Sequence, residues 1–286
     1  MEAKLGVLII HGVGSQDDCF AQPMMKDLEG KISNYNEICW KSVWWAPVLI
    51  KREKDLLDKL FPEENRPHCC LRLRYWIFKL RKFVVDYVGD AAAYRYVPDS
   101  DTQTNETYNQ IHAKVHDAIA NLRKELGNAD KPVIVMAHSL GSVIMSDYIW
   151  DRQNWDRQKK TRDDRYGKTP FERMETMVGF ITFGSPIPLF TLAYDPVVSI
   201  KFPPPFSENL KSKAKWLNFY DIDDVLGWPL KPLSKSYEAC VSEDKPINVG
   251  GIFAFWNPRC HNEYWTDNNF TEPVAQYISE ILKVCP

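Results

Sequence analysis

The feature that most constrains the fold is a series of short apolar runs, each followed by small or polar residues. The runs cover residues 4–10, 133–137, 177–183 and 214–220. Runs this short, without polar alternation, are typical of strands buried on both faces of a parallel sheet. Helical patterns separate them. The chain is therefore predicted to form an α/β fold, with a doubly wound, mostly parallel sheet flanked by helices.

The segments between these runs carry helical, strand or turn patterns. Apolar residues at helical spacing predict helices over residues 21–32, 51–60, 108–126, 140–150 and 274–282, with Gly127 as a stop and Thr271 as a candidate N-cap. Residues 37–47 are predicted to form a second strand, and residues 247–255 a strand or hairpin. The charged residues 151–175 are expected at the surface, and the Pro-rich residues 187–209 as irregular covering structure.

Composition limits the class of protein. A chain of 286 residues with 44% hydrophobic residues can bury a large core, and we expect one domain over residues 1–286. Within it, residues 48–101 are predicted to be a cap or lid insertion and residues 187–210 a second covering segment. A net charge of −2 gives no reason to expect a nucleic-acid partner.

The cysteines and the N-terminus predict a compartment. The seven cysteines show neither framework spacing nor a CxxC pair, which argues against a disulfide scaffold or a zinc site and favours a reducing compartment. No basic segment precedes a cleavable apolar stretch, and no apolar run approaches the ~20 residues of a transmembrane helix. A soluble, cytoplasmic protein is the expectation.

The stretch "VIVMAHSLGSVI" (133–144) places Ser139 between a predicted strand and a predicted helix. A very tight strand-to-helix turn exposes the residue at its apex and leaves room only for small side chains two positions away. Ala137 and Gly141 supply that room. Ser139 fits a nucleophile at such a turn, and it fits equally well a serine that caps the following helix. The local motif does not separate these two interpretations.

A serine nucleophile needs a base and an acid that orients the base. Of the six histidines, His261 lies in a polar loop before the last helix, where a catalytic base is expected. His112 and His116 stand four apart on a helix without the acidic neighbour of a metal motif, so we interpret them as packing or surface residues. Asp221, Asp223 and Asp224 follow a strand, where they could act in catalysis or simply solvate a turn. The chain order Ser, Asp, His is that of α/β-hydrolase triads.

These segments together resemble a known superfamily. The sequence is similar to the α/β-hydrolases, nearest to the lipase-like serine esterases that include the GPI inositol-deacylase-like branch. The resemblance is carried by "VLIIHGVGSQ" (7–16), "VIVMAHSLGSVI" (133–144), "ITFGSPIP" (181–188), "WLNFYDIDDVLGWPL" (216–230) and "CHNEYWTD" (260–267). It leaves residues 48–101 and 151–175 uncovered. The chain opens on the strand before His-Gly, so the sheet is expected to be trimmed to about six strands.

The resemblance implies roles for particular residues. It makes Ser139 the nucleophile, His261 in H-x-x-Y-W the base, and Asp224 before Val225 the acid, with Asp223 as the alternative acid. The His-Gly loop after the first strand implies an oxyanion hole formed by the backbone N–H groups of Val13 and Leu140. His11 and His138 are interpreted as structural. No metal or organic cofactor is implied.

Residues 69–96 form a basic, aromatic-rich segment with apolar residues at helical spacing. Such a helix is typical of a lid, of peripheral membrane contact or of a dimer interface. The alternative without a functional role is a helix packed on the rest of the domain with its basic residues in water. Two apolar covers over the site favour a small-molecule ester substrate with an apolar acyl group.

The hypothesis from the sequence is thus a serine hydrolase that cleaves a carboxylic ester through an acyl-enzyme. An amidase, peptidase or acyltransferase would use the same triad, and a non-catalytic binding protein of this fold is the alternative from another class.

Overall fold

A computed structural model describes residues 2–14, 16–60, 81, 85, 87–96, 105–154, 167–204, 208–250 and 260–286. The chain divides into two compact units. The first comprises Met1–Gly12, Asp18–Val43 and Val115–Pro286, and the second comprises Val13–Asp17 and Trp44–Lys114. Each unit is described by itself below.

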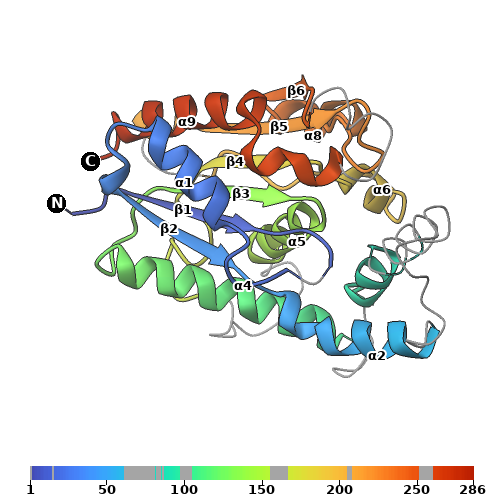
Figure 1. The fold of residues 1–286 in the computed structure, drawn as a ribbon. Helices are drawn as coiled ribbons and strands as arrows, with labels where there is room; N and C mark the ends of the chain where they lie inside the picture. Colours follow the sequence, from blue (N-terminus) through green and yellow to red (C-terminus); the bar gives the residue numbers. More distant parts are fainter. Residues whose placement is uncertain are drawn as a thin grey trace. The chain divides into compact units, whose positions relative to one another are not determined.

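The first unit is built on one parallel sheet of six strands (Figure 1). In chain order the strands are β1 (Leu5–Ile10), β2 (Ile38–Val43), β3 (Val133–His138), β4 (Met177–Phe183), β5 (Lys215–Asp221) and β6 (Glu243–Ile247). Their order in the sheet is β2-β1-β3-β4-β5-β6, and every neighbouring pair is parallel. The predicted α/β class and the parallel sheet of about six strands are confirmed.

This strand order places a topological switch point between β1 and β3. The chain leaves β1 toward β2 on one side and then returns to β3 on the other. In open parallel sheets, ligands bind beyond the carboxyl ends of the strands at such a point. Residues that follow β1 and β3, which include Gly12 and Ser139, therefore occupy the most favoured place for a site.

The burial of the strands follows their position in the sheet. Every residue of β1, β3 and β4 is buried, which is why these strands read as continuous apolar runs. The edge strand β6 has the sequence EDKPI and buries no residue fully. The strand predicted at residues 247–255 was therefore misplaced, since β6 ends at Ile247. The prediction followed an apolar run, which an edge strand does not need. Residues 251–255 lie outside the described residues.

Helices cover the sheet on both faces. Helices α1 (Gln22–Lys31) and α9 (Asn268–Leu282) pack together and share a buried cluster with the odd-numbered residues of β1. Gly6 points to the opposite face, where Leu122 of α4 (Glu106–Glu125) and Leu126 pack against it. Helix α5 (Leu140–Asn154) follows β3 directly. The predicted helices at residues 21–32, 108–126, 140–150 and 274–282 are confirmed, with shifted ends.

One predicted helix cap is wrong. Helix α9 begins six residues before Val274, and its N-cap is Asp267, whose side chain accepts a hydrogen bond from the N–H of Asn269. Thr271 is buried inside the helix and donates its hydroxyl to the carbonyl of Asp267. Pro273 is tolerated because it lies near the helix start. The stop at Gly127 is confirmed, since Gly127 adopts φ 76° directly after the helix.

The connections carry several short elements. They include the short helices α6 (Ile187–Thr191), α7 (Glu208–Lys211) and α8 (Lys235–Cys240) and 3-10 turns at Tyr35–Glu37, Lys231–Leu233 and Cys260–Thr266. The segment predicted as irregular at residues 187–209 thus starts and ends with a helical turn. Of the predicted surface segment 151–175, residues 155–166 lie outside the described residues. Among the cysteines in the described part of the chain, Cys39, Cys240, Cys260 and Cys285 form no disulfide.

The second unit holds α2 (Ile50–Leu60), a 3-10 turn at Ala46–Val48 and the start of α4. Tyr94 stacks on Tyr108 and its hydroxyl lies 2.8 Å from Nε2 of His112. Much of the predicted amphipathic segment 69–96 (residues 69–80, 82–84 and 86) lies outside the described residues, so its role as lid, membrane contact or dimer interface stays a prediction. Of the helices that the structure describes, none has the length and apolar character needed to cross a bilayer.

Candidate active site

The turn between β3 and α5, here called the nucleophile turn (residues 137–142), presents Ser139 at its apex. Ser139 has φ 49°, a left-handed conformation that non-glycine residues rarely adopt. Its backbone N–H donates to the carbonyl of Phe183 in β4, which fixes the apex against the neighbouring strand. Its hydroxyl Oγ lies 2.7 Å from Nε2 of His261. A residue that served only as a helix cap would direct that hydroxyl at the backbone of α5 instead.

The nucleophile turn is fixed by lack of space. A Cβ atom on Gly141 would lie 2.5 Å from the carbonyl oxygen of His11, and one on Gly12 would lie 2.5 Å from Cβ of Ser139. Side chains cannot approach that closely, so both positions need glycine. The expectation that Gly141 supplies room is confirmed, and the structure adds Gly12 in the loop after β1, whose close contact with Ser139 the sequence motif does not reveal.

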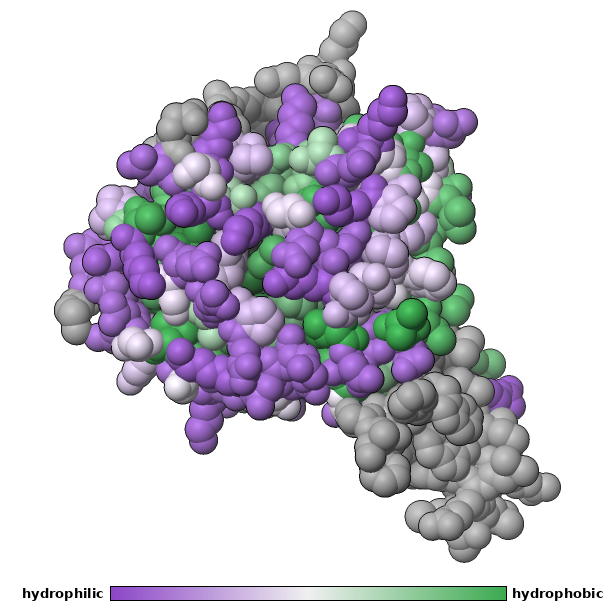
Figure 2. All heavy atoms as spheres, turned by 90° about the horizontal axis from the view of Figure 1, so that it is seen from above, coloured by the Kyte–Doolittle hydropathy of each residue, from purple (hydrophilic) through white to green (hydrophobic). Residues whose placement is uncertain are grey.

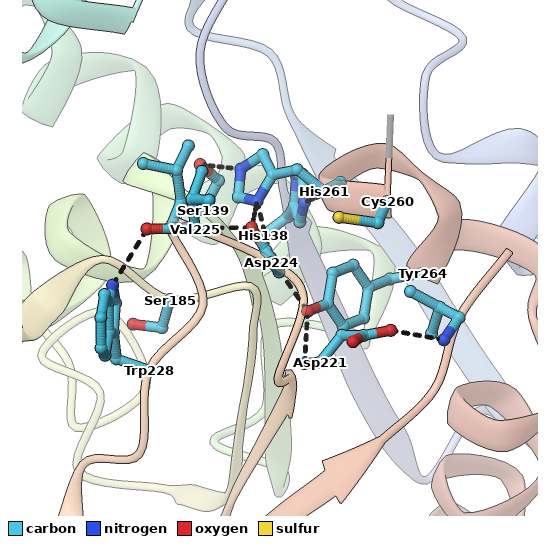
Figure 3. Close-up of polar contacts among 12 residues, drawn as sticks. His138, Ser139, Ser185, Asp221, Asp224, Val225, Trp228, Cys260, His261 and Tyr264 are labelled. Atoms are coloured by element: carbon cyan, nitrogen blue, oxygen red, sulfur yellow. Dashed lines mark hydrogen bonds and ion pairs between the residues drawn. The ribbon is translucent and has the colours of Figure 1, made fainter. Parts of the chain in front are cut away.

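Three side chains from distant parts of the chain meet at the carboxyl ends of the strands (Figure 3). Nε2 of His261 faces Oγ of Ser139, and Nδ1 of His261 lies 2.8 Å from Oδ2 and 3.0 Å from Oδ1 of Asp224. Ser139, Asp224 and His261 are 0%, 3% and 2% exposed. The structure thus brings the predicted nucleophile, base and acid into one hydrogen-bonded row.

The loop after β5, here called the acid turn (residues 221–228), decides between the two candidate acids. Asp224 points at His261, whereas Asp223 offers its backbone N–H to Oδ1 of Asp221. Asp221 is itself buried, and its Oδ2 accepts the N–H of Val249. Asp221 therefore shapes the turn, Asp224 contacts the base, and the alternative acid Asp223 is not brought to it.

The carboxylate of Asp224 is surrounded by donors. Its Oδ1 accepts the N–H of Leu226, and its Oδ2 accepts the hydroxyl of Tyr264 at 3.0 Å. Burial raises the pKa of Asp224, but the charge of His261 and these hydrogen bonds outweigh it, so the pKa falls below its ordinary value. Asp224 is thus held as a carboxylate, the form that can orient an imidazole.

Tyr264 is a functional candidate that the sequence reasoning missed. Its hydroxyl accepts the N–H of Asp221 at 2.8 Å, so its own proton is directed at Asp224. Burial raises the pKa of Tyr264 far above its ordinary range, so the hydroxyl keeps that proton. The signal was available in the H-x-x-Y-W motif, because Tyr264 follows His261 by three residues on one short helical turn.

Two further histidines near the site are neutral. Burial lowers the pKa of both His11 and His138 to about 3. Nε2 of His138 lies 2.7 Å from the carbonyl oxygen of His261, so His138 donates there and holds the loop of the base. Nδ1 of His11 lies 2.8 Å from the carbonyl oxygen of Gly12. The interpretation of both residues as structural fits these contacts.

The first amides of α5 are placed to receive negative charge. Leu140 is the first residue of this helix and is fully buried. The first N–H groups of a helix have no intrahelical acceptor, and the helix dipole favours an anion there. The N–H of Leu140 is therefore a suitable oxyanion donor. Val13 belongs to the second unit, and its part in an oxyanion hole stays a prediction.

A buried pair of serines ties the nucleophile turn to β4. Oγ of Ser142 donates to the carbonyl of Ser139 at 2.6 Å, and it lies 2.7 Å from Oγ of Ser185. Oγ of Ser185 in turn accepts the N–H of Ile187, the first residue of α6. The start of α6 is thereby linked to the backbone of the nucleophile.

In the part of the chain that the structure describes, the other reactive groups near the site do not form a competing centre. Burial raises the pKa of Cys260, which precedes the base, to about 12, so its thiol stays protonated. His116 lies 3.4 Å from the hydroxyl of Tyr148 and packs in the first unit. In the described ranges no group of three or more His, Cys, Asp or Glu side chains is arranged to hold a metal ion.

No protein-family model matches this chain, and no curated protein matches it either.

Proposed function

We propose that the chain is a serine hydrolase that cleaves a carboxylic ester through an acyl-enzyme intermediate. The observation that carries the proposal is the row from Oγ of Ser139 through His261 to Asp224, with both hydrogen bonds 2.7–2.8 Å long. A serine hydroxyl becomes an effective nucleophile when a neighbouring base accepts its proton and an acid orients that base.

In the first half of the reaction, Oγ of Ser139 attacks the ester carbonyl while Nε2 of His261 takes its proton. Asp224 stabilises the imidazolium that forms, and it stays ionised throughout. The carbonyl oxygen becomes an oxyanion next to the N–H of Leu140. One such donor is typically worth about 3 to 4 kcal/mol of transition-state stabilisation. His261 then protonates the leaving alcohol, and the acyl group remains on Ser139.

In the second half, His261 removes a proton from water, and the hydroxide attacks the acyl-enzyme. The tetrahedral intermediate collapses, His261 returns the proton to Oγ of Ser139, and the carboxylic acid leaves. No step calls for a group beyond these side chains and water.

We further propose that the sheet belongs to an α/β-hydrolase, within the lipase-like serine esterases. Three observations support this assignment. The candidate nucleophile follows β3, the acid follows β5 and the base follows β6, in the chain order Ser, Asp, His. The nucleophile has positive φ at a tight strand-to-helix turn. The loop after β1 holds a glycine against the nucleophile.

Labelling with a fluorophosphonate probe tests the nucleophile. The wild-type protein is expected to react covalently, Ser139→Ala is expected to lose the label completely, and Ser279→Ala, on the distant helix α9, serves as a matched control that labels normally. Equal labelling of wild type and Ser139→Ala would contradict the assignment, and no labelling of either would favour the binding-protein alternative.

Substrate tests separate the ester hydrolase from enzymes that share its triad. Nitrophenyl esters are expected to be hydrolysed with kcat/KM well above that of the matched nitroanilides. Turnover of the anilides without turnover of the esters would instead identify an amidase.

A further inference from the structure

A cavity of about 290 Å³ lies beside the nucleophile turn in the first unit. One wall is formed by α5 through Val143 and Trp150, and the facing wall by Ile187 and Phe190 of α6 and by Val198. Val143 and Ile187 are buried, whereas Val198 is 49% exposed. A void in the core would have only buried walls, so this cavity is a pocket that opens to solvent.

The pocket begins where the nucleophile turn ends. Val143 stands one helical turn after Ser139, and Ile187 stands two residues after Ser185. The hydrogen bonds from Ile187 through Ser185 and Ser142 to the carbonyl of Ser139 join the two walls at that end. The inner end of the pocket therefore lies one helical turn from Ser139, beside the segment that follows β4.

The walls offer little polarity to a ligand. The hydroxyl of Thr191 donates to the carbonyl of Pro188, and the hydroxyl of Tyr237 is hydrogen-bonded to Ser146. Among the described lining residues Asp147 is the single carboxylate and none is basic. A group that needs no hydrogen bonds and carries no negative charge fits these walls best.

The pocket also distinguishes the two halves of an ester. The leaving alcohol must lie beside His261, which protonates it, and the carbonyl oxygen must lie at the N-terminus of α5. No residue of the loop at Cys260–Thr266 is among the described residues that line the pocket. The remaining substituent, the acyl group, is the one that can enter.

We propose that this α5–α6 pocket binds the acyl group of the substrate and that this group is an uncharged, medium-length alkyl or aryl chain. The proposal rests on the ester hydrolase function proposed above and specifies its substrate class. An apolar cavity of about 150 Å³ accommodates one benzene molecule, so the pocket has room for roughly twelve carbon atoms.

Apolar side chains also reach the surface near the carboxyl ends of the strands. Figure 2 shows a mostly hydrophilic face with hydrophobic residues gathered along its right-hand margin, the side toward which the strands point in Figure 1. Exposed apolar side chains on the segments after β4 and β5 include Leu192, at 86% exposure, and Val225, at 64%.

Nitrophenyl esters of increasing acyl length give the first test. kcat/KM is expected to rise from acetate to octanoate by at least a hundredfold, since each fully buried methylene is worth about a factor of four. It should stop rising beyond about twelve carbons. In the reverse series, octyl acetate should gain little over ethyl acetate. A flat acyl series, or a gain confined to the alcohol, would overturn the proposal.

Filling the pocket gives the second test. Val198→Trp, and independently Val143→Phe on the facing wall, are expected to lower the octanoate-to-acetate ratio of kcat/KM at least tenfold. Tyr35→Trp, a control at an exposed position outside the described residues that line the pocket, should leave that ratio within about twofold of wild type. Circular dichroism melts verify that each variant is folded. An unchanged ratio in both filled variants would refute the pocket assignment.

A binding measurement separates the failure of this proposal from the failure of the proposed function. 2-Octanone, titrated calorimetrically into Ser139→Ala, is expected to bind saturably, and adding Val198→Trp should weaken binding at least tenfold. Binding of this kind without hydrolysis of any ester would leave the pocket assigned and the hydrolase function refuted. Hydrolysis of esters without ketone binding would refute the pocket alone.

Discussion

The nucleophile turn after β3 and the acid turn after β5 both lie at the carboxyl ends of strands in one sheet. Different interactions fix their backbone conformations. The conformation of the nucleophile turn is fixed by a lack of space. Gly141 within the turn and Gly12 beside it leave no room for a side chain, and Ser139 adopts a left-handed conformation. In the acid turn, the conformation is set by hydrogen bonds: Asp221 accepts two backbone N–H groups, and Asp224 accepts the N–H of Leu226.

The difference has a physical reason. A nucleophile must project from a rigid backbone, and close packing of backbone against backbone is the stiffest support available. An acid must remain ionised while buried, and a positive partner and donors directed at its oxygens offset the cost of burial. The comparison teaches that the first turn is sensitive to added volume and the second to lost donors or lost charge.

The largest effect is expected from removing the charge in the acid turn. Asp224→Asn keeps the shape but offers His261 an amide, and the corresponding change in a serine protease triad lowers kcat about ten-thousandfold. Asp223→Asn is the matched control, because Asp223 serves the turn through its backbone N–H. Steady-state kinetics with a nitrophenyl ester measures both. Equal losses in the two variants would show that the acid was assigned wrongly.

Added volume in the nucleophile turn is expected to be the next most damaging change. Gly12→Ala places a methyl 2.5 Å from Cβ of Ser139, so the serine must shift, and a misplacement of this kind costs about a hundredfold in rate. Gly30→Ala in α1, where a Cβ meets nothing within 4 Å, is the matched control and should be fully active. If Gly12→Ala also kept wild-type kcat/KM, close packing at this glycine would not be needed to position Ser139.

Loss of one donor in the acid turn is expected to have a moderate effect. Tyr264→Phe removes the hydroxyl that donates to Asp224 and leaves the N–H of Asp221 without its acceptor. We expect unfolding to become easier by about 1 to 3 kcal/mol and kcat to fall about tenfold. KM should stay near its wild-type value, because the lost hydroxyl contacts Asp224.

Tyr277→Phe is the matched control for Tyr264. Its hydroxyl also accepts a backbone N–H, from Lys215, and donates to the carbonyl of Val178, but it lies away from the triad. A similar loss of stability is expected, without a fall in kcat. If kcat is the same in the two variants, Tyr264 contributes only to the stability of the fold.

The smallest effect concerns pH and the buried histidines. The folded protein keeps His11 and His138 neutral down to about pH 3, whereas each takes up a proton near pH 6.5 when unfolded. The unfolded state thus binds more protons between these values, so stability falls as the pH drops below 6.5. The expected slope is about 1 kcal/mol per pH unit for each histidine.

His138→Gln tests this linkage, because Gln can still donate to the carbonyl of His261 but does not titrate. Urea unfolding between pH 7 and pH 5 should give a shallower pH dependence for the variant than for wild type. Identical slopes would mean that the folded protein accommodates a charged His138.

Much of the frame was predictable, and the errors have a common cause. The buried strands β1, β3 and β4 read as apolar runs, and the helices that cover them read as 3.6-residue patterns. The edge strand β6 and the cap Asp267 were misassigned, because a half-exposed edge has no apolar run and a cap depends on one local side-chain contact. Asp223 and Asp224 are adjacent, and no periodicity distinguishes which of them faces His261.

The sequence by itself determined the parallel α/β sheet, the small residues around Ser139 and the order of the three candidate residues. These features depend on burial and local volume, which residue type and spacing reflect directly. Only the tertiary structure decided that Asp224 contacts His261, that Tyr264 donates to Asp224, and that His138 is a neutral support. Those outcomes depend on contacts between segments far apart in the chain, which burial pattern and spacing do not encode.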